Sequence, residues 1–150
     1  MNNVETRICK AVCEVLQGLL TDAAIRGNIV VDGSFKGVQP TVGPTVEVTV
    51  KPRRYDGYSS PMAEIDVALD GSYPAASDTT LGRTLECYDA VATRLDEYHH
   101  TLAPVKRDFT VEGFTPVGFK LGGDGDIYID PDTKKRTFTL QFTLKGRISK

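Results

Sequence analysis

The chain has 150 residues, of which 40% are hydrophobic and 25% charged, and its formal net charge is −2. This is the size and composition of one soluble globular domain. A pI near 5.7 gives no electrostatic case for a nucleic-acid-binding protein, which usually carries a basic face. No apolar run approaches the ~20 residues that span a bilayer, so we do not expect a membrane protein.

The first twenty residues, MNNVETRICKAVCEVLQGLL, predict an amphipathic helix. Asn2 or Asn3 can cap its start. Its apolar side chains recur at helical spacing, in Val4, Ile8, Val12, Leu16 and Leu19. Polar and acidic residues interrupt the continuous apolar core that a signal peptide needs. We therefore expect a protein that is made and used in a cytoplasm.

Three cysteines, Cys9, Cys13 and Cys87, are present. An odd number without a signal peptide argues against a disulfide framework. Cys9 and Cys13 fall on one face of the predicted helix and could bind a soft metal ion. No neighbouring His or third Cys completes a tetrahedral set, so two small buried side chains are the simpler interpretation.

The next segments predict a turn, an irregular loop and a hairpin. We expect Thr21–Gly27 to end the helix and Gly27–Pro44 to form an irregular loop, with a short strand at Ile29–Val31. Thr45–Lys51 and Ala63–Leu69 both alternate apolar and polar residues, which predicts an antiparallel pair of strands. Their long connection is Pro52–Pro61, and a polar linker is expected over Asp70–Ser77.

A second long amphipathic helix is predicted from Asp78 or Thr79 to Pro104. The spacing of its apolar residues predicts a buried stripe, made of Leu81, Leu85, Tyr88, Ala92 and Leu95. His99 and His100 lie in its last turns, where positive charge suits the helix dipole. Neither has a recognisable catalytic partner, so we expect structural or surface roles.

After Pro104 we expect only strands and turns. Phe109–Glu112, Pro116–Leu121 and Asp126–Asp130 are short candidates. The last, Arg136–Ile148, reads RTFTLQFTLKGRI and alternates apolar with polar residues, mostly threonine. Such a strand has one apolar face that needs helices to cover it.

These elements predict a single α+β domain over residues 1–150. Its sheet is mixed and mostly antiparallel, and two amphipathic helices pack on one face. The order of elements is α-β-β-α-β-β, with extra short strands.

The stretch from Gly122 to Lys134, GGDGDIYIDPDTK, is the densest acidic segment. Its four aspartates, Asp124, Asp126, Asp130 and Asp132, suggest a calcium loop. An EF-hand loop needs Gly at its sixth position and Glu at its twelfth, where this chain has Ile129 and Lys135. The Gly, Asp and Pro residues of this segment are those that favour turns, and turns explain it better than a calcium site.

Phosphate-cradling glycine motifs and a nucleophile elbow are also missing from the sequence. We therefore predict no catalytic, cofactor-binding or metal-binding residues.

The connection between the two hairpin strands is the best candidate for a protein interface. It contains Arg53, Arg54, Tyr55 and Tyr58, and Arg and Tyr are enriched at interfaces. We expect these residues to protrude from a mobile hairpin tip that orders on contact with a partner. An exposed loop with two incidental tyrosines is an equal alternative.

A family resemblance covers nearly the whole chain. After the leading helix come PTVEVTVKPRRYDGY and MAEIDVALDGSY, then the helix LGRTLECYDAVATRLDEY, and finally RTFTLQFTLKGRI. This succession resembles the tail terminator proteins of long-tailed bacteriophages, the minor tail proteins that cap the tail tube. The resemblance implies a mixed sheet with packed helices and a homo-oligomer, a hexameric ring, in the neck region of the virion tail, assembled in the host cytoplasm.

By the same resemblance, the ring stops tube polymerisation and joins the tail to the head. The implied partners are the tail tube protein and a head-completion or neck protein. No membrane, cofactor or sequence-specific nucleic acid is implied, although DNA can pass through the ring lumen. The alternatives are another head–tail connector or tail-tube component, or a small α+β ligand-binding domain or enzyme.

Overall fold

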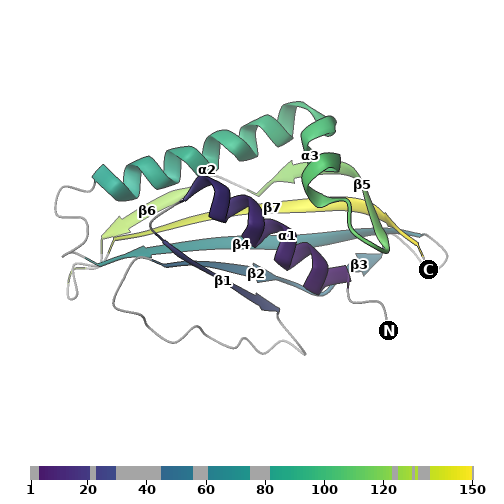
Figure 1. The fold of residues 1–150 in the computed structure, drawn as a ribbon, viewed down its shortest axis with the longest axis horizontal. Helices are drawn as coiled ribbons and strands as arrows, with labels where there is room; N and C mark the ends of the chain where they lie inside the picture. Colours follow the sequence, from purple (N-terminus) through teal and green to yellow (C-terminus); the bar gives the residue numbers. More distant parts are fainter. Residues whose placement is uncertain are drawn as a thin grey trace.

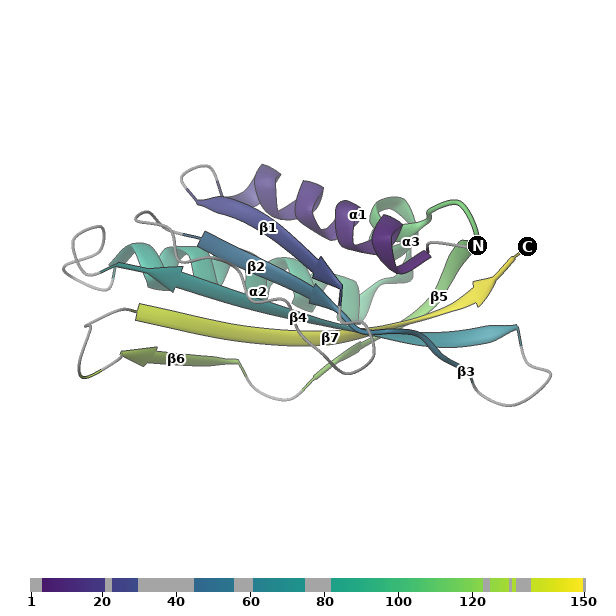
Figure 2. The same ribbon diagram turned by 90° about the horizontal axis from the view of Figure 1, so that it is seen from below.

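The computed structural model describes residues 4–20, 23–29, 45–55, 61–74, 82–122, 125–129, 131 and 136–149. Their strands form one sheet, and the helices lie on one side of it (Figures 1 and 2). The elements in chain order are α1 (Val4–Leu19), β1 (Ala24–Ile29), β2 (Thr45–Val50), β3 (Arg54–Tyr55), β4 (Met62–Tyr73), α2 (Gly82–His100), α3 (Leu102–Phe109), β5 (Phe114–Leu121), β6 (Asp126–Ile129) and β7 (Arg136–Ile148). None of these helices is long and apolar enough to cross a membrane.

The sheet is mixed and mostly antiparallel, as predicted. Its strands follow the order β1-β2-β4-β7-β5, with β3 beside β4 and β6 beside β7. Only β1 and β2, among the described pairs, run parallel. The predicted α+β fold class is therefore confirmed, with one more helix than the two that were expected.

The core lies between the sheet and the helices. Alternate residues of β4 and β7 point to the helices and are buried, and their register places Val67 opposite Phe142 and Leu69 opposite Leu140. From the helix side, α1 contributes Val4, Ile8, Val12 and Leu16, as its predicted stripe required. The period-two alternation that predicted β7 thus gives both its bounds and its buried face.

Two predicted segments are wrong because tertiary pairing extends strands through residues that resemble turns. Asp70–Tyr73, expected as linker, continues β4 and pairs with Thr139 to Arg136 of β7. Gly71 looked like a breaker, but it leaves room for the ring of Phe138. Likewise, the predicted turn before Gly27 is strand β1, whose backbone pairs with β2. Val30 and Val31 of the predicted short strand lie outside the described residues.

The predicted buried stripe of the second helix is wrong only in part, because Leu95 is buried as predicted and Tyr88 and Ala92 are partly buried against the core. Leu85 is 47% exposed, and the buried residues of α2 are Thr84, Cys87, Val91, Leu95 and Tyr98. The predicted Leu81 lies outside the described residues. At three of its positions the buried stripe lies one residue earlier than predicted, at Thr84, Cys87 and Val91.

Pro104 does not end a helix but lies in the first turn of α3. Proline is tolerated there because the first four N–H groups of a helix have no intrahelical partner. The strand predicted at Phe109–Glu112 is therefore wrong. Phe109 is the last residue of α3 and is buried, while Val111 forms only an isolated bridge to Phe114.

Two strand glycines are expected to be required by close packing. A Cβ atom on Gly71 would lie 2.1 Å from the ring of Phe138, and one on Gly146 would lie 2.2 Å from the ring of Phe114. Both rings are fully buried, so they have nowhere to move. We expect Gly71→Ala and Gly146→Ala each to lower the free energy of unfolding by about 1–3 kcal/mol, measured by urea denaturation.

Gly18 provides the matched control for these substitutions. It lies in α1, and a Cβ atom there would meet nothing within 4 Å. Gly18→Ala should therefore raise the free energy of unfolding by about 0.5–1 kcal/mol. Equal effects at Gly71 and Gly18 would contradict the packing described here.

Candidate protein interface

Arg53, expected on an exposed tip, is instead part of a nearly buried ion pair. Its backbone N–H donates to Glu5 Oε2 at 2.8 Å, its Nε donates to the same oxygen at 2.9 Å, and its Nη2 donates to Glu5 Oε1 at 2.6 Å. The two side chains are only 15% and 14% exposed. Arg53 therefore ties the segment before β3 to the first turn of α1, and the prediction that it protrudes is wrong.

The charges of this pair stabilise each other. Burial alone would raise the pKa of Glu5, but the hydrogen bonds and charge of Arg53 outweigh burial and leave that pKa below its ordinary value. The hydrogen bonds that the Arg53 side chain donates to Glu5 correspondingly raise the pKa of Arg53. Glu5 also lies in the first turn of α1, where the helix dipole favours a negative charge.

Arg54 and Tyr55 are exposed, as predicted. The Arg54 side chain is 58% exposed and lies 2.8 Å from Asp66 Oδ1 and 3.5 Å from Glu64 Oε2, both on the neighbouring strand β4. Tyr55 is 52% exposed, and its hydroxyl accepts a hydrogen bond from Arg53 Nη1 at 3.4 Å. Tyr58 lies outside the described residues. Arg54 and Tyr55 are thus available to a partner, whereas Arg53 is structural.

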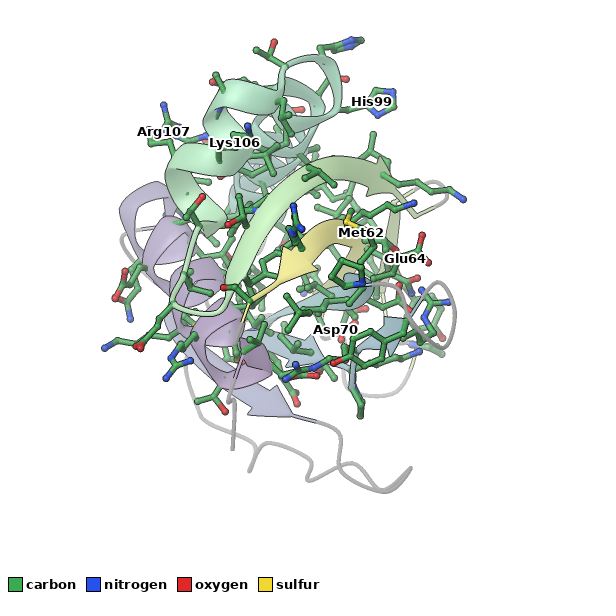
Figure 3. The ribbon with its side chains drawn as sticks, turned by 90° about the vertical axis from the view of Figure 1, so that its right-hand side faces the viewer. Met62, Glu64, Asp70, His99, Lys106 and Arg107 are labelled. Atoms are coloured by element: carbon green, nitrogen blue, oxygen red, sulfur yellow. The ribbon has the colours of Figure 1, made fainter. Side chains whose placement is uncertain are left out.

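A larger candidate surface, not singled out from the sequence, is the face of the sheet away from the helices. We call it the open face. Viewed along the strands in Figure 3, Met62, Glu64 and Asp70 of β4 lie on this side of the sheet, and His99, Lys106 and Arg107 lie in the helix layer. Exposed and half-buried polar side chains cover the open face, including Thr45, Glu47, Glu64, Asp66, Asp70, Thr137, Thr139, Gln141 and Thr143.

The open face is shallow and internally hydrogen-bonded. Asp66 Oδ1 accepts a hydrogen bond from Thr143 Oγ1 at 2.7 Å as well as the bond from Arg54. A hollow of about 180 Å³ near its centre is lined by Lys51, Asp66, Gln141 and Thr143 together with their strand neighbours. The strict alternation in β7 was the sequence signal for this face, because it predicts a continuous row of polar side chains opposite the core.

A second charged cluster joins the helices. Asp108 of α3 accepts hydrogen bonds from the Tyr98 hydroxyl and from Arg107 Nε, the latter at 2.9 Å, and lies 3.5 Å from Arg94. Burial raises the pKa of Asp108, but the bonds from Arg107 and Tyr98 outweigh burial and lower it. Burial also raises the pKa of Tyr98. A carboxylate held charged by two arginines is a poor proton acceptor, so this cluster fastens α2 to α3.

The cysteines, histidines and aspartates that the sequence suggested as candidate sites lie in different parts of the fold. Cys9 and Cys87 are buried, and Cys13 is half-buried. A hydrogen bond with Cys9, followed by burial, raises the pKa of the Cys13 thiol. His99 and His100 are exposed at the end of α2. Among the described residues no group of three His, Cys, Asp or Glu side chains could hold a metal ion. Asp124, Asp130 and Asp132 of the acidic segment lie outside those residues.

No protein-family profile matches this chain, and no curated protein sequence matches it. One similar solved structure is described as the "Virion of native gene transfer agent (GTA) particle". A chain of that particle aligns with a TM-score of 0.48 and 14% sequence identity, and the alignment covers 96% of this chain and 91% of that chain.

Proposed function

We propose that this chain is a structural protein of a phage-like virion, and specifically a tail terminator that caps the tail tube. In this role it forms a ring, stops tube polymerisation and presents a joining surface to the head. The proposed partners are further copies of the chain, the tail tube protein, and a head-completion or neck protein.

The observation that carries this proposal is the two-sided sheet. The large apolar side chains of β2, β4 and β7 face the helices, and a broad polar face remains uncovered by any described element. Polar surfaces with exposed Arg and Tyr suit contacts between proteins. The tail terminator resemblance of the sequence supplies the kind of assembly in which such a surface would be used.

The test is reconstitution with the cognate tail tube protein. We expect tubes grown with the chain present to stop at limited lengths, with the chain bound at one end, as seen by electron microscopy with labelled protein. Native mass measurement of the chain alone and with tube protein gives the number of copies. Tubes of unlimited length with no chain at their ends would overturn the proposal. Binding along the whole tube would favour the alternative, a tail-tube component.

Variants of Arg54 and Tyr55 test the candidate interface separately from folding. Arg54→Ala combined with Tyr55→Ala should lower the free energy of unfolding by about 1 kcal/mol or less, because both side chains are exposed. It should weaken attachment to the tube end by about tenfold or more, since central Arg and Tyr contacts carry much of an interface's energy.

The matched control is Lys106→Glu, an exposed charge reversal on α3 within the helix layer (Figure 3). We expect it to leave both stability and capping unchanged. Normal capping by the Arg54/Tyr55 variant would remove these two residues from the interface.

A further inference from the structure

Two of the three cysteines bring their sulfur atoms together between α1 and β1. Cys9 and Cys13 are one helical turn apart on α1, and both sulfur atoms lie beside Gly27 of β1. A Cβ atom on Gly27 would lie 2.5 Å from Cys9 Sγ and 3.3 Å from Cys13 Sγ. Both sulfur atoms therefore lie within 3.3 Å of one point, and the two thiols are hydrogen-bonded to each other.

These two side chains, which we call the thiol pair, are open to solvent on one side. Cys9 is buried, but Cys13 is only half-buried. Gly27 is exposed, and its strand β1 lies at the edge of the sheet (Figure 2). Because glycine has no side chain, this position leaves the sulfur atoms uncovered, whereas any other residue here would press on Cys9. The thiol pair is therefore within reach of a small ion.

Two converging thiols form a donor set for a soft metal ion. Thiolate sulfur selects soft ions such as Cu(I), which two ligands can hold in a linear arrangement. Structural zinc sites take four ligands, and within the described part of the chain no third His, Cys, Asp or Glu joins the thiol pair. The donor set therefore fits a two-coordinate ion better than a zinc ion.

We propose that Cys9 and Cys13 together bind one Cu(I) ion in a two-coordinate site between α1 and β1. Binding forms two Cu–S bonds and releases the two thiol protons to solvent, with no change in the oxidation state of copper or sulfur. Because both ligands come from one turn of the folded helix, the ion stabilises the folded state. This site goes beyond the proposed tail function and does not depend on it.

The experiment is a competition for Cu(I), carried out under nitrogen with a reductant that is not a thiol. The full chain is mixed with Cu(I) held by a weak chromophoric chelator, and the absorbance lost by the chelator complex counts the ions transferred. The variants are Cys9→Ala and Cys13→Ala. The matched control is Cys87→Ala, which removes the buried cysteine of α2. Circular dichroism first establishes that each protein is folded.

We expect the wild type and Cys87→Ala to take up one Cu(I) ion per chain, and Cys9→Ala and Cys13→Ala to lose this uptake. Copper should raise the midpoint of thermal unfolding of the first two proteins only. X-ray absorption at the copper edge should show two sulfur neighbours. Zn(II) added in place of Cu(I) should not be retained, because four ligands are lacking.

Several outcomes would overturn the inference. These are a wild type that takes no copper from the chelator, uptake by Cys13→Ala equal to that of the wild type, or a copper ion with three or four protein ligands. Loss of uptake in Cys87→Ala would move the site elsewhere, and uptake only by unfolded protein would show that no folded site exists. If Cys9→Ala does not fold, Cys13→Ala decides the question, because its side chain is only half-buried.

Discussion

Replacing Phe142 with alanine is expected to lower the free energy of unfolding by about 3–5 kcal/mol. Phe142 is 2% exposed in the middle of β7. Its ring centroid lies 6.0 Å from that of Phe109 on α3 and 5.1 Å from that of Phe119 on β5. The truncation therefore leaves a cavity where the sheet meets the helix layer, and partial collapse around it cannot recover the lost contacts.

The matched control is the adjacent residue. Gln141 lies on the open face and is exposed, so Gln141→Ala should change the free energy of unfolding by no more than about 0.5 kcal/mol. Guanidinium denaturation of both variants measures the difference. A loss below about 1 kcal/mol at Phe142, or similar losses at both residues, would contradict the register of β7.

Replacing Arg53 with alanine is expected to lower the free energy of unfolding by about 2–4 kcal/mol at neutral pH. The change removes both guanidinium hydrogen bonds to Glu5 and leaves a carboxylate that is only 14% exposed without its cation. Arg54→Ala is the control, because its side chain is 58% exposed and exposed pairs contribute about 0–1 kcal/mol. A double-mutant cycle with Glu5→Gln isolates the energy of the pair.

The effect of Arg53→Ala should depend on pH in a defined direction. The folded-state pKa of Glu5 is lowered, so its contribution to stability is fully present above the unfolded-state pKa. That contribution is lost as the pH falls from the ordinary carboxyl range through the lowered folded-state pKa. The difference between wild type and Arg53→Ala should therefore shrink in acid. A difference that stays constant from neutral pH to below pH 3 would show that the ion pair is not its cause.

Local pattern predicted the strands whose side chains alternate, and tertiary contacts decided the rest. The alternation in β7 predicted its bounds and its buried face because half-buried strands must repeat every two residues. In β1 the pattern is weak, and pairing with β2 determines the structure. In α2 the helical spacing predicted the buried Leu95 correctly, but the exposed Leu85 was expected in the stripe and the neighbouring Thr84 is buried instead.

For the connection before β4, the sequence predicted the exposure of some residues but not their tertiary contacts. Composition indicated a charged and aromatic connection, and Arg54 and Tyr55 are exposed there. The partner of Arg53 lies 48 positions away in the sequence, and no local pattern links Arg53 to Glu5. The open face was visible only as polar residues in separate strands, because its charge arrangement depends on the register between β2, β4, β7 and β5.

The position of β7 has a consequence for folding. β7 comes after every other strand in the sequence, yet it lies between β4 and β5 in the sheet. A nascent chain synthesised only through β6 can form the β2–β4 hairpin and the helices, but β4 and β5 lack their common neighbour and the apolar side of β4 is incompletely covered. Contacts this distant in sequence slow folding and leave an unpaired strand edge that invites aggregation. Completion of the sheet must therefore wait for the synthesis of β7.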